Sequence, residues 1–266
     1  MNNDTLGNRM KNYYEAVPKT KLVRRMPVII RLDGKAFHTF TRGFKKPFDP
    51  IMIKTMQDTM KYLCENIQGC VLGYTQSDEI SLVLQDYKEL TTDAWFDYEV
   101  QKMCSVSASM ATLAFNKYYA INIAEMTENE EEFKKYATKL NQALFDSRVF
   151  NIPKEEVTNC IYWRQLDAER NSILSVGQAY FSPKQLHGKS CKDIITMLEE
   201  EKNIVWGNLP TTQKRGSCCI KNKELRYILV DYEEFSRWII DNDIPKFKEE
   251  GRQYIENLIL FGEDNK

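Results

Sequence analysis

Residues 28–119 alternate between short apolar strands and longer helical segments, in the order β-α-β-β-α. The first strand reads VIIRLDG, and the first helix begins at FDP, where Asp49 is a suitable N-cap and Pro50 suits the first turn. That helix carries one apolar stripe: Met52, Met56, Met60, Leu63 and Ile67. The segment CVLGYTQSDEISLVLQ predicts two short strands around a polar turn, and the second strand alternates from Glu79 to Gln85. This order favours an α+β fold, with a ferredoxin-like antiparallel sheet covered by helices.

The pattern changes near residue 140. A long helix is predicted over residues 93–119, and its middle, CSVSASMATLA, is rich in small residues suited to close packing. The segment EEFKKYATKLNQALFDSRVF has helical spacing, with a strand as the alternative for its end. Ser182 and Ser190 are predicted helix N-caps, and residues 231–261 are predicted to form two helices that break near Pro245. We therefore divide the chain into residues 1–140 and a mostly helical region of residues 141–266.

The composition is typical of a soluble cytoplasmic protein. No apolar run reaches the ~20 residues of a membrane span, and the first residues lack the apolar core of a signal peptide. The seven cysteines are odd in number and have no CxxC spacing, which favours a reducing compartment over a disulfide framework. With only two histidines, far apart in sequence, a metal would need carboxylate ligands, which favours a hard cation such as magnesium.

The net charge gives no sign of a nucleic-acid partner, because it is −1 at pH 7. A polyanion site would need the 37 basic residues to gather on one face of the protein. Local basic clusters do occur around residues 19–25, 42–46, 184–192 and 214–226. Each is more often a solvated surface, so the charge pattern alone does not decide between the two interpretations.

Acidic residues stand at the end of the first strand and at the hairpin tip. Asp33 and Gly34 end the strand, and Asp78 and Glu79 follow the hairpin turn. Because consecutive strand side chains point to opposite faces, we expect Asp78 rather than Glu79 to meet Asp33. Two carboxylates about 4 Å apart repel one another, and Mg²⁺ offsets this repulsion while accepting waters and substrate phosphates as further ligands. Each motif taken alone is also typical of an ordinary polar turn.

Four segments together carry a resemblance to a known family. RLDGKAFHTF, KPFDP, GYTQSDEISLVL and YWRQLD, in this order and spacing, resemble the tRNA-His guanylyltransferase-like family over about residues 8–170. Its members are 3′–5′ nucleotide polymerases, and their catalytic domain resembles the palm of conventional polymerases and holds two magnesium ions. The resemblance implies a palm-like catalytic domain in residues 1–140 and a fingers-like region in residues 141–266 that completes the nucleotide and tRNA contacts. It also implies a homotetramer, which is common in the family.

The resemblance assigns roles to individual residues. Asp33 and Asp78 are implied as catalytic ligands of both magnesium ions, Gly34 as a backbone-carbonyl ligand, and Glu79 as their catalytic acidic neighbour. Nucleotide contacts are implied for Arg31, Lys35, Ala36, Phe37, His38, Lys46, Asp49, Ser77 and Lys102. RNA contacts are expected at Asn171, Lys189, Lys214 and Arg215.

Structural alternatives remain open for four of these residues. Arg31 is equally suited to pair with a carboxylate, and Lys46 to lie in a solvated loop. Asp49 would serve only as a helix cap, and His38 would be a structural histidine.

The chain departs from the family pattern after WRQLD, where the guanylyltransferases that act on tRNA-His carry a His-Ile-Asn-Asn motif. The matching residues here are Glu169, Arg170, Asn171 and Ser172, so only the asparagine is retained. Glu99 also stands where an arginine often lies in the triphosphate site. These departures favour the branch of the family that repairs 5′-truncated tRNAs by template-directed addition.

The implied reaction is nucleotide addition to the 5′ end of a tRNA, opposite a templating base. The 5′ end is activated by ATP or already carries a triphosphate, and the 3′-hydroxyl of an incoming GTP or other nucleoside triphosphate then attacks it with the help of Mg²⁺. Three alternatives stay open: a tRNA-His guanylyltransferase proper, another palm-type nucleotidyltransferase or cyclase, and a non-catalytic RNA-binding module. The last typically displays aromatic residues on its sheet face, where this chain carries acids.

Overall fold

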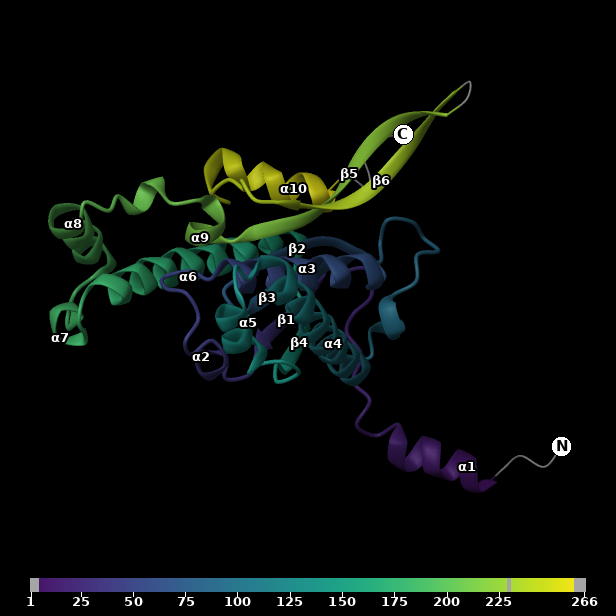
Figure 1. The fold of residues 1–266 in the computed structure, drawn as a ribbon. Coiled ribbons are helices and arrows are strands. Elements are labelled where there is room, and N and C mark those ends of the chain that lie inside the picture. The colour runs from purple at the N-terminus through teal and green to yellow at the C-terminus, as the bar shows by residue number, and fades with distance from the viewer. Residues whose placement is uncertain (1–4, 229–230, 261–266) are drawn as a thin grey trace.

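The computed structural model describes residues 5–228 and 231–260, which form a six-stranded sheet with helices on both of its faces (Figure 1). The strand order is β4-β1-β3-β2-β5-β6, and every neighbouring pair is antiparallel. The strands are β1 (Val28–Gly34), β2 (Cys70–Gln76), β3 (Glu79–Leu84), β4 (Phe145–Asn151), β5 (Ser217–Ile228) and β6 (Asp231–Asp241). The predicted α+β class with an antiparallel sheet is confirmed.

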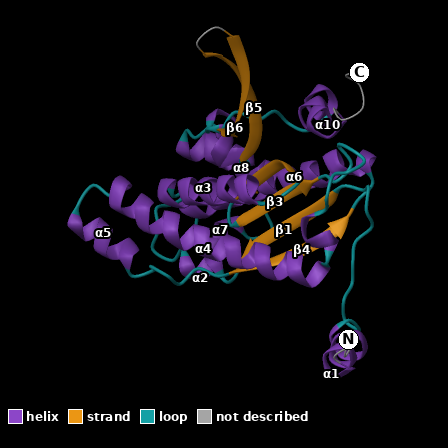
Figure 2. Cartoon of the chain, turned by 90° about the vertical axis from the view of Figure 1, so that its right-hand side faces the viewer, coloured by secondary structure: helices purple, strands orange, loops and turns teal. Residues whose placement is uncertain are grey.

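Four strands and two long helices form a ferredoxin-like core. Helix α3 (Pro50–Asn66) lies between β1 and β2 in the chain, and helix α4 (Val100–Met126) lies between β3 and β4. Both helices pack on one face of the sheet, against Ile30 and Leu32 of β1 (Figure 2). Helices α6 (Lys154–Tyr180) and α10 (Gln253–Leu260) cover the other face, where Ile29 and Val83 are buried. Odd-numbered residues of β1 therefore face α6, and even-numbered residues face α3 and α4.

The remaining helices are shorter than α3, α4 and α6. They are α1 (Thr5–Met10), α2 (Phe37–Phe40), α5 (Glu130–Ala137), α7 (Pro183–Leu186), α8 (Cys191–Lys202) and α9 (Thr211–Arg215), with the short turns η1 (Lys11–Glu15), η2 (Trp95–Tyr98), η3 (Trp206–Asn208) and η4 (Glu249–Arg252). Of these, α1, α7 and α8 lie away from the core (Figure 1). Helix α8 packs on the distal half of α6 through Val176, Ile194 and Leu198. Ser182 and Ser190 form capping boxes at the starts of α7 and α8, which confirms both predicted caps. In the described ranges, no helix combines the length and the apolar character needed to cross a membrane.

The start of α3 follows from its sequence. A side-chain oxygen of Asp49 accepts a hydrogen bond from the backbone N–H of Met52 at 3.0 Å, and Pro50 occupies the first helical position, where no N–H donor is needed. The predicted apolar stripe is buried against the sheet: Met52, Met56, Met60, Leu63 and Ile67. The predicted cap and packing face of this helix are both confirmed.

Helix α4 begins and ends later than the predicted range of residues 93–119. It runs from Val100 to Met126. It cannot start earlier, because Phe96, Asp97 and Tyr98 have positive φ angles of 51°, 50° and 54°, which an α-helix does not contain. The small residues Ser107, Ala111 and Ala114 are buried, as expected for close packing.

Only one of the two helices predicted over residues 231–261 exists. Residues 231–241 form strand β6, which pairs with β5 along its whole length, from Ile228↔Asp231 to Cys218↔Asp241. These residues form a strand despite their helical spacing, because β5 offers a backbone partner for each of them. The second predicted helix is α10, beyond Pro245.

Strands from both sides of residue 140 share the sheet. The strand alternative for the end of EEFKKYATKLNQALFDSRVF is correct, since β4 lies there and pairs with β1, and β5 pairs with β2. Helices α6 to α10 make up most of the rest of residues 141–266. The boundary at residue 140 stays a prediction.

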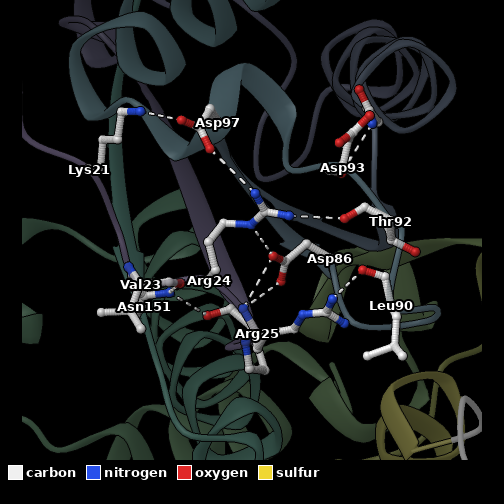
Figure 3. Close-up of polar contacts among 12 residues, drawn as sticks. Lys21, Val23, Arg24, Arg25, Asp86, Leu90, Thr92, Asp93, Asp97 and Asn151 are labelled. Carbon is white, nitrogen blue, oxygen red and sulfur yellow. Dashed lines mark hydrogen bonds and ion pairs between the residues drawn. The ribbon is translucent and has the colours of Figure 1, made fainter.

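A polar cluster fixes the chain at the end of the sheet where β1 begins (Figure 3). Asp86 is completely buried, and its carboxylate accepts hydrogen bonds from Arg24 Nε at 2.6 Å and from the backbone N–H of Arg25 at 3.0 Å. Asp97 lies further out and pairs with Lys21 and with the Arg24 guanidinium. These contacts attach the segment before β1 to the loop between β3 and α4.

Candidate active site

At the other end of β1, Asp33 and Asp78 come together. Strands β1 and β3 are adjacent, and Asp33 lies opposite Glu79 in their register. The backbone N–H of Gly34 donates to the carbonyl oxygen of Asp78 at 3.0 Å, which holds the hairpin tip against the strand end. The sheet thus brings together two carboxylates that lie 45 residues apart in the sequence.

The hairpin tip is a two-residue turn. Gln76 pairs with Glu79 across it, so only Ser77 and Asp78 lie between the strands, and Ser77 has a φ of 51°. The Ser77 hydroxyl donates to the Asp78 carboxylate at 3.1 Å. Asp78 faces the cavity described below, whereas Glu79 faces α6, as expected for consecutive residues at a strand end.

Little positive charge balances the two carboxylates. Burial raises the pKa of Asp78 above its usual value, and the charge of Asp33 raises it further. A guanidinium nitrogen of Arg148 lies 3.9 Å from the Asp33 carboxylate, and within the part of the chain that the structure describes Asp78 has no ion-pair partner. An added cation would therefore stabilise this pair.

Gly34 and the residues that follow it form a tight bend into α2. A Cβ atom on Gly34 would lie 2.3 Å from the ring of Phe37, so no larger residue fits there. Ala36 has a φ of 55°, and the backbone N–H of Lys35 donates to the Leu144 carbonyl at 2.8 Å. Phe37 is buried in an aromatic cluster with Phe40, Phe115 and Phe145, while His38 stays exposed. The Phe37 ring is the anchor of the bend.

A cavity of about 480 Å³ opens beside the carboxylates, a size typical of small-molecule sites. Its walls come from the bend after β1, residues 44–53, the hairpin tip, one face of α6 and the α9 segment. The predicted site residues that line it are Asp33, Gly34, Ala36, Phe37, His38, Lys46, Asp49, Ser77, Asp78, Asn171 and Lys214. Four stretches of the chain meet here: residues 33–53, 76–78, 168–175 and 212–216.

Asp49 lines the cavity and is also fully engaged as a cap. Its carboxylate accepts hydrogen bonds from the backbone N–H groups of Lys45 and Met52, at 2.9 and 3.0 Å, and from the Tyr136 hydroxyl. The structural role considered for Asp49 is present, and a contact with a nucleotide stays a prediction. Lys46 is exposed at the rim of the cavity.

Several predicted residues lie outside the cavity. Arg31 faces α6, with its guanidinium 5.8 Å from the centre of the Trp163 ring, and its Nε has no hydrogen-bond partner among the described residues. Lys102 lies near the start of α4, with its ammonium over the Phe96 ring. The start of α4 lies beside the segment that precedes β1, because residues 20–22 are hydrogen-bonded to residues 98–100.

The other residues outside the cavity are Lys35, Glu79, Lys189 and Arg215. Lys35 is exposed, and Lys189 is exposed between α7 and α8 at the distal end of α6 (Figure 1). Arg215 Nε lies 3.5 Å from the Glu169 carboxylate. The catalytic role of Glu79, the nucleotide role of Lys35 and the RNA roles of Lys189 and Arg215 stay predictions.

Sequence reasoning missed Arg164, the partner of Glu79. Its Nε and one Nη donate to the two Glu79 oxygens at 2.6 and 2.8 Å, and both side chains are about nine-tenths buried. One signal was available: Val157, Ile161, Arg164 and Ala168 follow helical spacing, so the YWRQLD arginine lies on the buried stripe of α6. Arg148, beside Asp33, was missed because β4 was only an alternative.

The residues present fit a magnesium ion. Asp33 and Asp78 supply carboxylate oxygens, and Gly34 lies between them on the cavity wall. Among the described residues no group of three or more histidine, cysteine, aspartate or glutamate side chains is arranged for a metal. A hard cation that takes few protein ligands and keeps oxygens from water or phosphate suits such a site better than zinc.

Comparison with known proteins agrees with this arrangement. Residues 7–153 match the model of the tRNAHis guanylyltransferase family. A probable tRNA(His) guanylyltransferase of Dictyostelium discoideum is 26% identical over 217 residues, which cover 75% of this chain and 77% of that protein. A solved bacterial tRNA(His) guanylyltransferase-like protein in complex with ATP has a TM-score of 0.81 and 43% identity, over 96% of this chain and 99% of that one. A second such structure, in complex with GTP, has a TM-score of 0.75 and 40% identity over the same shares.

Proposed function

Because the chain belongs to the tRNAHis guanylyltransferase family, it is a nucleotidyltransferase, and we propose that it adds nucleotides in the 3′–5′ direction to the 5′ end of a truncated tRNA. The observation that carries this proposal is the convergence of Asp33 and Asp78 at the wall of a cavity of about 480 Å³. Structural neighbours that bind ATP or GTP support a nucleotide as the occupant of this cavity.

The reaction needs an activated 5′ end. A 5′-monophosphate attacks the α-phosphorus of ATP and releases pyrophosphate, or the end already carries a triphosphate. The 3′-oxygen of the incoming nucleotide then bonds to the activated 5′-phosphorus, AMP or pyrophosphate leaves, and the hydroxyl proton is lost. Magnesium ions bound at Asp33, Asp78 and the Gly34 carbonyl would lower the hydroxyl pKa and neutralise the charge that develops on the leaving group.

The remaining cavity residues bind and orient the nucleotide in this proposal. Lys46 and Lys214 line different walls, and their ammonium groups would contact the polyphosphate once Lys214 gives up its hydrogen bond to the Gly207 carbonyl. Ala36 and His38 bring a small residue and an exposed imidazole to the base and ribose. Base choice is left to pairing with the template strand, so the protein needs few contacts that read the base.

The tRNA would be bound by the helical region. Lys189 lies at the distal end of α6, and Asn171 and Lys214 lie at the cavity, so a line of contacts along α6 would guide the acceptor stem to the carboxylates (Figure 1). Affinity from such phosphate contacts falls steeply with salt. We also propose that the chain works as a homotetramer in the cytoplasm, as the family resemblance implies.

Repair of truncated tRNAs is favoured over a role restricted to tRNA-His by one local observation. Glu169, where the tRNA-His enzymes have the first residue of their His-Ile-Asn-Asn motif, forms ion pairs with Arg215 at 3.5 Å and Lys246 at 3.1 Å. Through these ion pairs Glu169 joins α6 to the end of α9 and to the segment before α10. Its carboxylate is therefore engaged within the protein, and it does not offer RNA the contact that a histidine there would make.

The test is extension of 5′-truncated tRNAs, of several amino-acid specificities, with each nucleoside triphosphate and Mg²⁺. We expect the nucleotide opposite the templating base to be added to the 5′ end. A single guanosine added only to full-length tRNA-His would indicate the restricted enzyme, and a product from ATP alone would indicate a cyclase. Growth of the 3′ end would contradict the proposal.

A further inference from the structure

A chain of polar contacts beside the cavity passes through Arg164, to which the proposed reaction assigns no role. Its guanidinium donates to both Glu79 oxygens at 2.6 and 2.8 Å and to the Asp167 carboxylate at 2.9 Å. Asp167 accepts two further hydrogen bonds: its Oδ1 from Arg170 at 2.7 Å, and its Oδ2, which Arg164 also contacts, from the Asn171 side-chain amide at 3.3 Å. The contacts run without a break from the hairpin tip to the α6 wall of the cavity.

The pair of Arg164 and Glu79 is costly to keep. Both groups are nearly buried, and a buried ion pair usually contributes no more stability than an apolar pair of the same volume. Burial lowers the pKa of Arg164, but the hydrogen bonds and the charges of Glu79 and Asp167 together raise it more, so this pKa lies above its usual value. Such a pair is better explained by the geometry that it fixes than by stability.

The contact between Arg164 and Glu79 affects the positions of both Asp33 and Asp78. Glu79 is the chain neighbour of Asp78 and the cross-strand partner of Asp33, so holding its carboxylate fixes the backbone that carries both. The Arg164 guanidinium also stacks over the Trp163 ring at 4.4 Å, which limits its rotation. At its other end Asp167 orients Asn171, which lines the cavity.

We propose that Arg164 is a positioning residue, which sets the separation between the Asp33–Asp78 pair and the α6 wall of the cavity through Glu79 and Asp167. Arg164 touches neither the cation nor the nucleotide in this assignment, and Glu79 acts by holding the strand end rather than by binding a metal. This inference rests on the proposed function only in the nucleotide-addition assay, and the measurement of Mn²⁺ binding does not depend on that function. It depends on the forked guanidinium, because a lysine ammonium cannot make two parallel bonds to one carboxylate.

The main test is Arg164→Lys, which keeps the charge and loses the fork. The first readout is binding of Mn²⁺ alone, followed by electron paramagnetic resonance, and the second is the Mg²⁺ concentration that half-saturates nucleotide addition. Residues that orient metal-binding carboxylates typically change metal affinity 10–100-fold when replaced, so we expect about a 10-fold loss of Mn²⁺ affinity and a matching rise in the Mg²⁺ requirement. Addition at saturating Mg²⁺ should recover to within about threefold of the wild-type rate, since no group of Arg164 takes part in the reaction itself.

Arg252→Lys is the matched control. Arg252 also bridges to α6, with bonds to Glu256 at 3.0 Å and Asn159 at 2.7 Å, but neither partner lines the cavity. We expect this variant to bind Mn²⁺ as the wild type does. If Arg164→Lys unfolds, Glu79→Gln replaces it, since this change keeps the shape of the side chain and removes the charge that Arg164 holds.

Two results would overturn the inference. One is wild-type Mn²⁺ affinity and Mg²⁺ dependence in a folded Arg164→Lys or Glu79→Gln variant. The other is an equal loss of affinity in Arg252→Lys, which would point to general loosening of α6. Failure of the proposed function is distinguishable, because the Mn²⁺ measurement needs no RNA: a protein that extends no tRNA but loses Mn²⁺ affinity on Arg164→Lys would leave the inference standing.

Discussion

The two ends of strand β1 use carboxylates in opposite ways. Near its start, Asp86 is fully buried and accepts hydrogen bonds from Arg24 and from the Arg25 backbone, so its charge is matched (Figure 3). At its end, Asp33 and Asp78 line one cavity, and among the described residues their one ion-pair contact is with Arg148, 3.9 Å from Asp33. The matched carboxylate contributes to the fold, whereas the pair at the cavity has little positive charge beside it and would be stabilised by a bound cation, as we propose.

The pKa values of aspartates at the two ends of β1 are shifted in opposite directions. Lys21, with help from Arg24, holds the pKa of Asp97 below its usual value. Burial and the charge of Asp33 raise the pKa of Asp78. The same chemical group is thus made more acidic in the ion pair near the start of β1 and less acidic at the candidate site.

The largest expected effect comes from removing one of the unmatched carboxylates. We expect Asp78→Ala or Asp33→Ala to lower the rate of nucleotide addition on the order of 10³-fold, since the charge stabilisation that a metal supplies in phosphoryl transfer is worth several kcal/mol. The free energy of unfolding should stay the same or rise slightly, because a repulsion is removed. Single-turnover extension and urea unfolding of the same preparations measure the two effects. Full Mg²⁺-dependent activity in either variant would break the comparison.

The next effect is expected at the other end of the strand, where the substitution should lower stability and leave activity nearly unchanged. Asp86→Ala leaves the Arg25 backbone N–H and the Arg24 guanidinium without their acceptor, which should lower the free energy of unfolding by about 2 kcal/mol. Nucleotide addition per folded molecule should change less than about twofold. Thermal unfolding and active-site-normalised rates separate the two. A loss of activity without a loss of stability would show that the two ends do not have separate roles.

Asp49 has features of both classes, so it sharpens the distinction. Its carboxylate is matched by two backbone N–H groups and the Tyr136 hydroxyl, yet it lines the cavity. We expect Asp49→Ala to cost about 1 kcal/mol of stability and Asp49→Asn to cost less, since asparagine also caps helices. Isothermal titration with ATP then tests the second role: weaker binding by Asp49→Asn, with stability retained, would place Asp49 among the nucleotide contacts.

The smallest effect concerns the exposed pair of Lys21 and Asp97. Because pairing lowers the pKa of Asp97, its contribution to stability is present above the usual value of 3.8 and is lost as the pH falls through the lower folded value. The difference in unfolding free energy between the wild type and Asp97→Asn should therefore be small at pH 6 and vanish in acid. High salt should reduce it as well, since both side chains are more than half exposed. A difference that grows on acidification would contradict this assignment.

The sequence predicted those parts of the fold that depend on short-range interactions. Asp49 reaches Met52 only three residues away, and the strands of the Asp78 hairpin pair across a turn of two residues, so local pattern was sufficient for both. Strand β6 was missed because its helical spacing is overruled by β5, a partner that a local pattern does not reveal. The convergence of Asp33 and Asp78 was predictable because neighbouring antiparallel strands in a β-α-β-β unit leave few arrangements.

Site residues that depend on distant side chains were not predictable in the same way. The Arg164–Glu79 contact joins residues 85 positions apart, and nothing in the hairpin sequence indicates that Glu79 faces a helix arginine. Lys102 was assigned from its spacing of seven residues after Trp95, and such spacing does not reveal that α4 begins beside the segment before β1, away from Asp33. Only the assembled fold distinguishes residues that line the cavity from those that lie beside it.

The two-residue turn at Ser77 and Asp78 has a consequence for how this protein can change over evolutionary time. Side chains alternate between the sheet faces, so one residue inserted or deleted between Thr75 and Ile80 would carry Glu79 toward the cavity and Asp78 away from it. Substitutions nearby alter single contacts, but a change of length exchanges the identities of the two acids at once. Relatives that keep the chemistry are therefore expected to vary in length almost everywhere along the chain before they vary in length here.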